Sequence, residues 1–520
     1  MRNDSVKKRF SFKILSGAIT AALGLVTVSL VTRALGPSLL GKFDFLRAQF
    51  TAVVSFLDIG SSQAFYTYNS RHDRYENSRA AIVFYRFFVG VVSLLVILGT
   101  WLAIALNWSD TFWPEVGEAR DLLLGALLAL SIWIFTIVTG FGDSKGQTFE
   151  VEIIKVTVRI VGIGVLFAMY FLRAITLSSY LIFNIALVLV PAVVSWGFYR
   201  SQEVSTARQP VTRQELRTVG RFFLNFCSPM FVFAACCLVH DLMDRWLLQH
   251  YAGSVEQGYF ALGFRFAAIC MLVIAAINPL FMREFSRAHG ENRRHEMRRL
   301  YIRHLSAIYF LVAVLAVFLA FHSNELLFLL GGQEYQAASW AFFLLALSPL
   351  SNVYGQLNGS VYYATERTRT YRNVGIAIMV VGLAASYFLI APRDNPLPGL
   401  GLGAIGLSIK TLATQWGSVN LLAYFNCRFL GLSYGKFLWR QIVVIAAVAV
   451  PLWGLRGGVI MSDVTHLSTA GLWIRTTLTG VGYGVWVTAL MFLFPGLVGS
   501  ERAELVRLAG RIPWWRKRRD

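Results

Sequence analysis

The chain has 520 residues, of which 56% are hydrophobic, and it carries 48 Lys and Arg against 28 Asp and Glu. Its apolar runs are too long and too frequent for a set of soluble domains, because a membrane-spanning helix needs about 20 mainly apolar residues. The composition therefore excludes a soluble multidomain protein and predicts an all-α, polytopic membrane protein.

Apolar runs long enough to span a membrane start at fourteen places along the chain, and short loops join most of them. They begin near Ile14, Phe45, Ile82, Leu122, Ile153, Leu177, Phe222, Tyr259, Leu305, Trp340, Val374, Leu402, Gln441 and Leu472. The first run follows a basic stretch, as in a signal peptide, but no small-residue cleavage site comes after it, so we expect an uncleaved first helix. The sequence predicts about 14 transmembrane helices and no sizeable domain outside the membrane.

Basic residues alternate between successive loops. If the N-terminus is cytoplasmic, the even-numbered loops and both tails hold 34 of the Lys and Arg, and the opposite side holds 6. Cytoplasmic loops carry such an excess of positive charge. The split predicts that both termini are cytoplasmic, and it explains most of the net charge of +20 without a nucleic-acid partner.

Two segments of the chain echo each other. Residues 33–47 and 251–265 each contain two glycines five positions apart, and Arg47 or Arg265 follows the second glycine by six or seven residues. The segments join spans 1–2 and spans 7–8, so the repeat unit contains six helices. Parallel repeats of this kind place a binding cavity between two bundles in alternating-access carriers.

The repeat predicts two pseudo-symmetric six-helix lobes followed by two additional helices. We expect an N-lobe over residues 1–205, a C-lobe over 206–430, two helices within 431–495 and a basic cytoplasmic tail over 496–520. The tail combines tryptophans with basic residues, which suits a leaflet of anionic lipid.

Short motifs spread over residues 10–430 resemble a known family. They are Val31-Thr32-Arg33-Ala34-Leu35-Gly36-Pro37, Gly41-Lys42-Phe43-Asp44-Phe45, Phe56-Leu57-Asp58-Ile59-Gly60, Ser228-Pro229, Asp244-Arg245, Gly258-Tyr259-Phe260 and Gly332-Gln333-Glu334-Tyr335. These motifs resemble the bacterial polysaccharide and O-antigen flippases of the multidrug/oligosaccharidyl-lipid/polysaccharide exporter superfamily.

The resemblance implies a two-lobed helical transporter in the bacterial inner membrane. It would move an oligosaccharide linked to a lipid, typically undecaprenyl pyrophosphate, from the cytoplasmic to the outer leaflet. Its partners would be this substrate, membrane lipids and the proteins that polymerise or assemble polysaccharide.

Charged residues inside the apolar runs point to the cargo. The basic ones are Arg47, Arg86, Lys155, Arg159, Arg245, Arg265, Lys410 and Arg475, and the acidic ones we count are Asp58, Glu152, Asp241 and Asp244. A basic residue facing lipid at mid-depth costs about 2.5–3.5 kcal/mol, so several together are expected to face a wet cavity. Arginine binds phosphate oxygens through two parallel hydrogen bonds, so the excess of positive charge favours an anionic cargo.

Arg47 and Arg265 are the leading candidates for binding pyrophosphate, because they occupy corresponding positions in the two repeats. Lys410 lies well inside its apolar run and is the next candidate. For all three, the alternative is a side chain that extends to the lipid headgroups.

Lys155, Arg159 and Arg86 are further candidates. Glu152, Lys155 and Arg159 follow a helical spacing that places them on one face. This face can receive a phosphate from the cytoplasm, or Glu152 and Lys155 can simply pair. Arg86 lies near the cytoplasmic end of its run, where reaching the headgroups is the alternative.

Carboxylates inside the apolar runs have two interpretations. Asp58 has no obvious local partner, so it is a candidate for coupling transport to an ion; the alternative is a satisfied polar contact between helices. Asp241 and Arg245 are four residues apart and are expected to form a structural ion pair.

Several kinds of chemistry leave no trace in the sequence. There is no nucleotide-binding loop of the GxxxxGK[ST] type and no HExxH motif. The five cysteines lack metal-ligand spacing. We therefore expect a transporter without cofactor or metal and not an enzyme. The alternative is a cation-coupled exporter of small molecules from the same superfamily.

Overall fold

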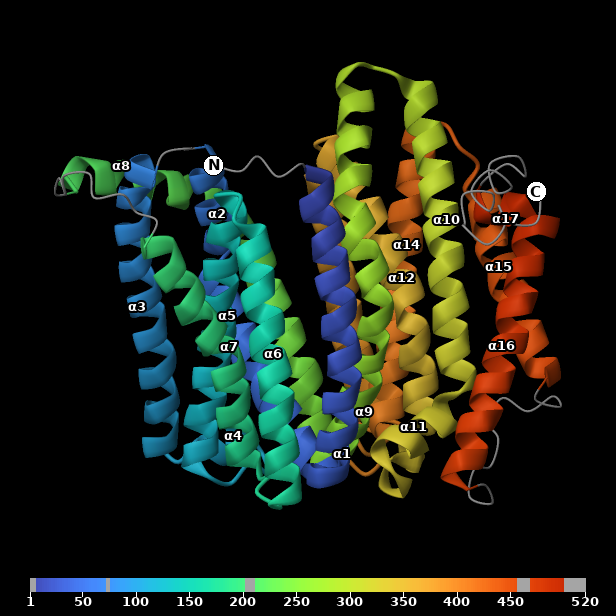
Figure 1. Cartoon of the computed structure of the whole chain (residues 1–520), viewed down its shortest axis with the longest axis horizontal. Coiled ribbons are helices and arrows are strands. Elements are labelled where there is room, and N and C mark those ends of the chain that lie inside the picture. The colour runs from blue at the N-terminus through green and yellow to red at the C-terminus, as the bar shows by residue number, and fades with distance from the viewer. Residues whose placement is uncertain (1–5, 72–74, 202–210, 456–467, 500–520) are drawn as a thin grey trace, which may run out of the picture. The chain divides into compact units, whose positions relative to one another are not determined.

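The structure is a computed structural model that describes residues 6–71, 75–201, 211–455 and 468–499. Within these ranges the chain folds into helices and contains no strand (Figure 1). The helices are α1 (Val6–Asp58), α2 (Ser61–Arg71), α3 (Tyr75–Ala105), α4 (Ser109–Phe112), α5 (Ala119–Ser144), α6 (Thr148–Phe171), α7 (Leu177–Ser201), α8 (Arg213–Cys227), η1 (Ser228–Met230), α9 (Phe231–Gly290), α10 (Arg294–Phe321), α11 (Ser323–Gly331), η2 (Gln333–Ala338), α12 (Ser339–Ala364), α13 (Thr368–Ile390), α14 (Gly403–Leu430), α15 (Tyr434–Leu455), α16 (Thr469–Leu493) and α17 (Pro495–Val498).

Apolar helices dominate the described part of the chain, as expected. Nine of its helices are long and apolar enough to cross a membrane, and α8 together with α9, bent by 61° between them, would make a tenth. Each of the fourteen apolar runs falls in or beside a helix. One helix, α1, contains both the run that begins near Ile14 and the run that begins near Phe45, so the runs do not each correspond to a separate helix. The all-helical membrane architecture is thus confirmed, whereas the number of fourteen spans stays a prediction.

The chain divides into two compact units. Unit 1 comprises residues 1–258 and 390–403, and unit 2 comprises residues 259–389 and 404–520. The six-helix lobes proposed from the repeat stay a prediction. Nearly all of the basic tail lies outside the described residues.

The two echoed segments have the same backbone conformation in the structure. Helix α1 is broken at Gly36, with φ 67° and ψ 176°, and α9 is broken at Gly253, with φ 82° and ψ 178°. Glycine adopts positive φ without the steric cost that a side chain would add. Pro37 then resumes α1, because its missing N–H is not needed in a first helical turn.

The second glycines of the echo bring the two segments into contact within unit 1. A Cβ atom added to Gly41 would overlap the carbonyl oxygen of Ser254, and one added to Gly258 would overlap that of Pro37. The two helices therefore approach each other backbone to backbone, which only glycine permits at these positions.

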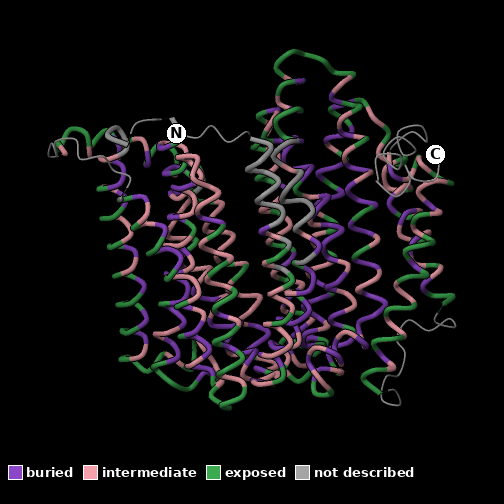
Figure 2. The backbone as a smooth tube through the Cα atoms, in the orientation of Figure 1, coloured by how far each residue is buried: buried purple, intermediate pink, exposed green. Residues whose placement is uncertain are grey.

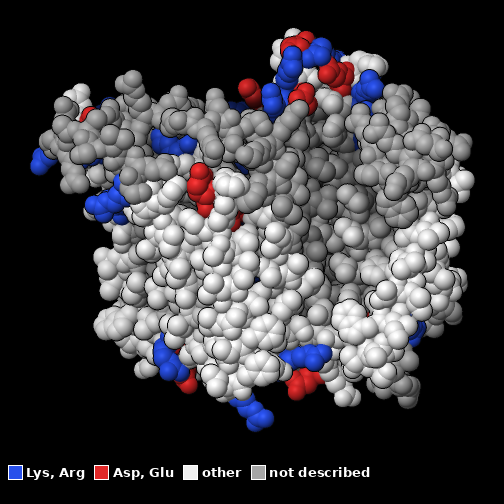
Figure 3. Space-filling model, in the orientation of Figure 1, with Lys and Arg blue, Asp and Glu red and all other residues white. Residues whose placement is uncertain are grey.

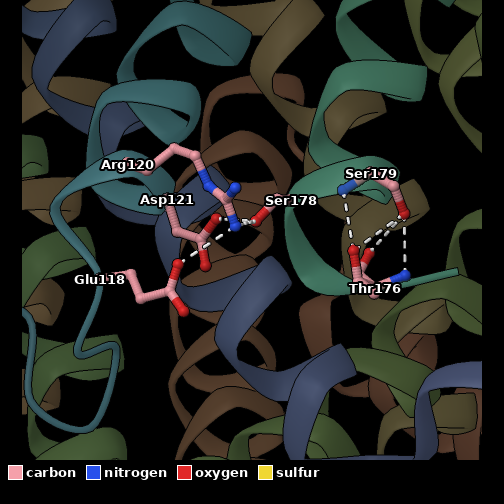
Figure 4. Close-up of polar contacts among 6 residues, drawn as sticks. All are labelled: Glu118, Arg120, Asp121, Thr176, Ser178 and Ser179. Atoms are coloured by element: carbon pink, nitrogen blue, oxygen red, sulfur yellow. Dashed lines mark hydrogen bonds and ion pairs between the residues drawn. The ribbon is translucent and has the colours of Figure 1, made fainter.

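The ends of α5 and α7 are held together by a polar cluster (Figure 4). Arg120 donates to Ser178 Oγ over 2.7 Å, and Ser178 donates to Asp121 Oδ1 over 2.5 Å. Beside it, Thr176 and Ser179 accept hydrogen bonds from each other's backbone N–H over 2.8 and 3.2 Å, which caps the start of α7.

Exposed apolar side chains line α3, whose green stretches in Figure 2 run along its length. On the face drawn in Figure 3, the charged side chains of the described residues gather near the ends of the helices, and the middle is largely uncharged. An apolar surface of this kind suits contact with lipid tails.

In unit 2, a buried polar network joins three helices. Asn358 of α12 accepts a hydrogen bond from Tyr301 of α10 over 2.7 Å and from Asn426 of α14 over 3.0 Å. Arg367 in turn donates to Asn426 Oδ1 over 2.6 Å, and its guanidinium lies 4.0 Å from the ring centroid of Phe429. Buried polar groups paired in this way specify how the helices pack.

The turn between α9 and α10 stands beyond the ends of α12 and α14 in Figure 1. At this turn Arg287 Nε donates to Glu291 Oε1 over 3.1 Å, and this hydrogen bond lowers the pKa of Glu291. Glu291 also pairs with Arg293.

Candidate functional site

A cluster of two arginines around one aspartate lies inside unit 1. Arg47 Nη2 is 2.9 Å from Asp44 Oδ1, and Arg245 Nη1 is 3.0 Å from Asp44 Oδ2. Asp44 and Arg47 lie one turn apart in α1, so they share a helix face, and Arg245 comes from α9. We call Asp44, Arg47 and Arg245 the arginine cluster.

Burial differs sharply between the members of the arginine cluster. The side chain of Asp44 is 2% exposed and that of Arg245 is 14% exposed, whereas that of Arg47 is 40% exposed. Arg47 is therefore held by a buried carboxylate, while part of its side chain stays accessible. A guanidinium held in this way can donate further hydrogen bonds to an incoming anion.

The neighbouring turn of α9 carries more ionisable groups. His240 Nδ1 lies 3.0 Å from Asp241 Oδ1, and His240 Nε2 lies 3.7 Å from Asp244 Oδ2. Arg245, expected to pair with Asp241 of its own helix, forms its ion pair with Asp44 of α1. Gln49 Nε2 also donates to the carbonyl oxygen of Leu242 over 3.0 Å, which joins the same two helices.

Arg265 and Lys410 belong to unit 2. Arg265 follows the break of α9 and is half-buried. Lys410 lies in α14 and is only 2% exposed, so this ammonium group is enclosed by protein. The predicted pairing of Arg265 with Arg47 across a cavity stays a prediction, because the two residues lie in different units.

The face of α6 that carries Glu152, Lys155 and Arg159 is partly neutralised. Lys155 Nζ is 2.9 Å from Glu152 Oε1, so the pairing considered as an alternative is present. Ser16 of α1 donates to the second oxygen of Glu152 over 2.5 Å. Arg159 is half-buried, and its Nη2 would lie 3.6 Å from a Cβ atom placed on Gly24. Glu152 and Arg159 thus both lie against α1.

Arg86 lies on an exposed position of α3, and its guanidinium carbon is 5.0 Å from the centroid of the Trp196 ring. This geometry is a cation–π contact between α3 and α7.

Asp58, for which the sequence showed no obvious local partner, forms the satisfied polar contact considered as the alternative, and its role in ion coupling stays a prediction. Its Oδ1 accepts hydrogen bonds from Ser61 Oγ over 2.7 Å and from the Ser62 backbone over 3.0 Å. Trp133 Nε1 donates to the same oxygen over 3.0 Å, and Tyr85 OH over 3.2 Å. Asp58 ends α1 and caps α2 through Ser61 and Ser62, whereas Tyr85 comes from α3 and Trp133 from α5.

Asp44 is not among the acidic residues counted inside the spans. Its spacing of three residues from Arg47 is typical of an ion pair on one helix face, and this signal was available in the sequence. Counting Asp44 raises the acidic residues of the spans to five, against eight basic ones. The excess of positive charge inside the runs therefore persists.

Glu115 was also missed, and it joins a loop to the break in α9. Glu115 Oε2 accepts hydrogen bonds from the Ser254 backbone over 2.8 Å and from Ser254 Oγ over 2.5 Å. The carboxylate thus caps the helix that resumes after Gly253. No sequence spacing links positions so far apart.

Comparison with known proteins shows the fold. No protein-family profile matches the chain, and no curated protein matches it. Among solved structures, it is similar to the lipid II flippase MurJ in an inward closed conformation, with 14% identity and a TM-score of 0.68 over 93% of this chain and 98% of that one.

Two transporters of the MOP superfamily are also similar. One is a multidrug resistance MATE family transporter in its inward-facing conformation, with 14% identity and a TM-score of 0.59 over 79% of this chain and 94% of that one. The other, from Pyrococcus furiosus, is described as having a binding pocket of reversed polarity, with 12% identity and a TM-score of 0.53 over 84% of this chain and 94% of that one. The chain therefore has the fold that these transporters share.

Proposed function

We propose that this protein is a flippase of the MOP superfamily that moves a lipid pyrophosphate-linked oligosaccharide from the cytoplasmic to the outer leaflet. The observation that carries the proposal is the arginine cluster. Arg47 is tied to a buried carboxylate yet stays partly exposed, inside a helix long and apolar enough to span the membrane. A pyrophosphate needs such donors, because it cannot cross hydrocarbon without a replacement for its water shell.

The second part of the proposal is alternating access. The fold is shared with transporters solved in inward-facing and outward-facing states. We include Arg265 and Lys410 with Arg47 among the residues that bind the anionic head group. Arg159, Lys155 and Arg86 serve as weaker contacts for the phosphate nearer the cytoplasm, with Lys155 shared with Glu152.

The remaining features follow from this role. The protein would lie in the bacterial inner membrane with both termini in the cytoplasm, as the distribution of basic loops predicts. Its lobes would comprise residues 1–205 and 206–430, with the helices of 431–495 added outside the repeat. Proteins that polymerise or assemble the polysaccharide would receive the product.

Transport by purified protein tests the proposal. Proteoliposomes carry a fluorescent lipid pyrophosphate-linked oligosaccharide, and a membrane-impermeant quencher reports the fraction in the outer leaflet. Each charge-assisted hydrogen bond contributes about 2 kcal/mol, so Arg47→Ala with Arg265→Ala should slow the transfer by two to three orders of magnitude. Lysine at both positions should restore part of the rate, because it keeps the charge but loses the fork geometry.

The matched control is Arg173→Ala, which removes an exposed arginine from the loop after α6. Transfer by the double alanine variant at the rate of this control would contradict the proposal. Extrusion of cationic dyes that survives in the double variant, without transfer of the labelled lipid, would favour the small-molecule exporter.

A further inference from the structure

Helix α8 is amphipathic and basic. Arg213, Arg217 and Arg221 recur every four residues and are exposed, while Val219 is 1% and Phe223 is 5% exposed. A helix with one apolar and one basic face is suited to lie at the surface of a membrane.

The start of α8 is defined by a capping box. Glu215 N donates to Thr212 Oγ1 over 3.2 Å, and Thr212 N donates to Glu215 Oε2 over 2.8 Å. The backbone N–H groups of Thr212 and Glu215, which have no partner within the helix backbone, are both hydrogen-bonded by side chains of the same segment. The helix is therefore locally defined before it packs.

Aromatic contacts hold α8 against its neighbours in unit 1. The ring centroid of Phe223 is 5.2 Å from that of Phe84 and 5.6 Å from that of Tyr85, both in α3. The ring centroid of Phe222 lies 5.4 Å from that of Tyr68 in α2. The buried face is thus occupied, and the rest of α8 stays available.

A groove of about 640 Å³ runs between α3 and α8. Its apolar lining includes Val83 and Phe87 of α3 and Leu224 of α8, and Arg217 and Arg221 also line it. Phe87 is 74% and Leu224 is 70% exposed, so large apolar side chains stand open beside two guanidinium groups.

Gly220 of α8 lines the groove and faces Phe84 of α3. A Cβ atom there would lie 3.4 Å from Phe84 Cε2, in contact with the opposite wall. The two helices are therefore close together at this point, and Gly220 and Phe84 close one side of the groove.

We propose that this groove binds an anionic phospholipid of the cytoplasmic leaflet. The phosphate would lie between Arg217 and Arg221, which can each donate two hydrogen bonds to it. One acyl chain would follow Phe87 and Leu224 along α3. Free phosphate does not explain the apolar walls, and a neutral lipid does not explain the two arginines. The groove is separate from the arginine cluster, so this inference does not depend on the identity of the cargo.

Native mass spectrometry of the purified full-length chain tests this site. The probe is dioleoyl phosphatidylglycerol, and dioleoyl phosphatidylcholine is the neutral comparison. Each basic residue near an anionic lipid strengthens binding about fivefold, so Arg217→Gln with Arg221→Gln should weaken phosphatidylglycerol binding by about twenty-five-fold and leave phosphatidylcholine unchanged. The control, Arg200→Gln with Arg213→Gln, removes the same charge from exposed positions outside the groove and should keep the original preference.

The apolar half of the site has its own test. Phe87→Ser should weaken binding of the dioleoyl lipid and leave a short-chain phosphatidylglycerol unaffected, because only the long chain reaches Phe87. A phosphatidylglycerol with a photoreactive group in its acyl chain should label peptides from residues 79–105 or 213–227. The proposal would be overturned if Arg217→Gln with Arg221→Gln and its control lost phosphatidylglycerol binding equally. Labelling confined to other peptides would overturn it too. Binding of only the lipid-linked oligosaccharide at this groove would overturn it as well.

Discussion

Gly41 and Gly258 occupy equivalent positions in two repeated segments, and each faces the backbone of the other segment. The segments are separated by more than two hundred residues in sequence, yet each contains a helix break at a glycine with positive φ. The two segments that resemble each other in sequence are therefore also in contact in the structure.

Replacing either of these glycines should disturb this contact. In Gly41→Ala the new Cβ would meet the Ser254 carbonyl oxygen, which belongs to backbone and cannot rotate away. Overpacking costs about 1–3 kcal/mol, and we expect at least this loss in the free energy of unfolding. Thermal unfolding in detergent measures it. Gly164→Ala in α6, where a Cβ meets nothing within 4 Å, should be neutral or stabilising.

Neutralising Asp44 should destabilise unit 1. The carboxylate serves two guanidinium groups while almost fully buried, and breaking a buried ion pair costs about 3–5 kcal/mol. Asp44→Asn should therefore lower the unfolding temperature strongly. Adding Arg245→Gln should recover part of the loss, because the double variant removes one of the charges left behind. If the loss of stability in the double variant equalled the sum of the losses in the two single variants, a shared ion pair would be contradicted.

Glu115→Ala should loosen the resumed part of α9. The side chain caps the helix at Ser254, and a lost N-cap costs about 1–2 kcal/mol. Hydrogen exchange of residues 252–258 should accelerate by roughly one order of magnitude. Glu118→Ala, which removes a carboxylate that is 66% exposed, should change this rate little.

Removing the amide of Asn358 should weaken the packing of α10, α12 and α14. Asn358→Ala deprives Tyr301 and Asn426 of an acceptor in a buried setting, which costs about 1–3 kcal/mol. Unfolding followed by near-UV circular dichroism should show the loss. The comparison is Asn373→Ala, an exposed position where we expect less than about 0.5 kcal/mol.

The role proposed for Asp58 in ion coupling can be separated from its role as a cap. Asp58→Asn keeps one oxygen acceptor for Ser61 and Trp133, so stability should fall by less than in Asp58→Ala, for which about 1 kcal/mol is expected. If Asp58 couples transport to protons, the Asn variant should also lose the dependence of lipid transfer on an imposed pH gradient. An unchanged dependence would leave Asp58 with the structural role alone.

The sequence by itself determined the class of the molecule and where its turns lie. Long apolar runs and alternating basic loops indicated a helical membrane protein, because both signals arise from local composition. The glycine pairs marked the breaks at Gly36 and Gly253, because a positive φ is a local property that the residue type at one position decides. Lys155 and Glu152 were paired as the helical spacing allowed.

Only the tertiary structure decided which charges share a partner. Arg245 pairs with Asp44 of α1, Glu115 caps a helix that begins at Ser254, and Asp58 is surrounded by Ser61, Tyr85 and Trp133. These contacts join residues from different helices, or from a loop and a helix, and helical periodicity predicts neighbours only within one helix. The close approach of Gly41 to Gly258 depends in the same way on how two helices cross, which neither segment specifies alone.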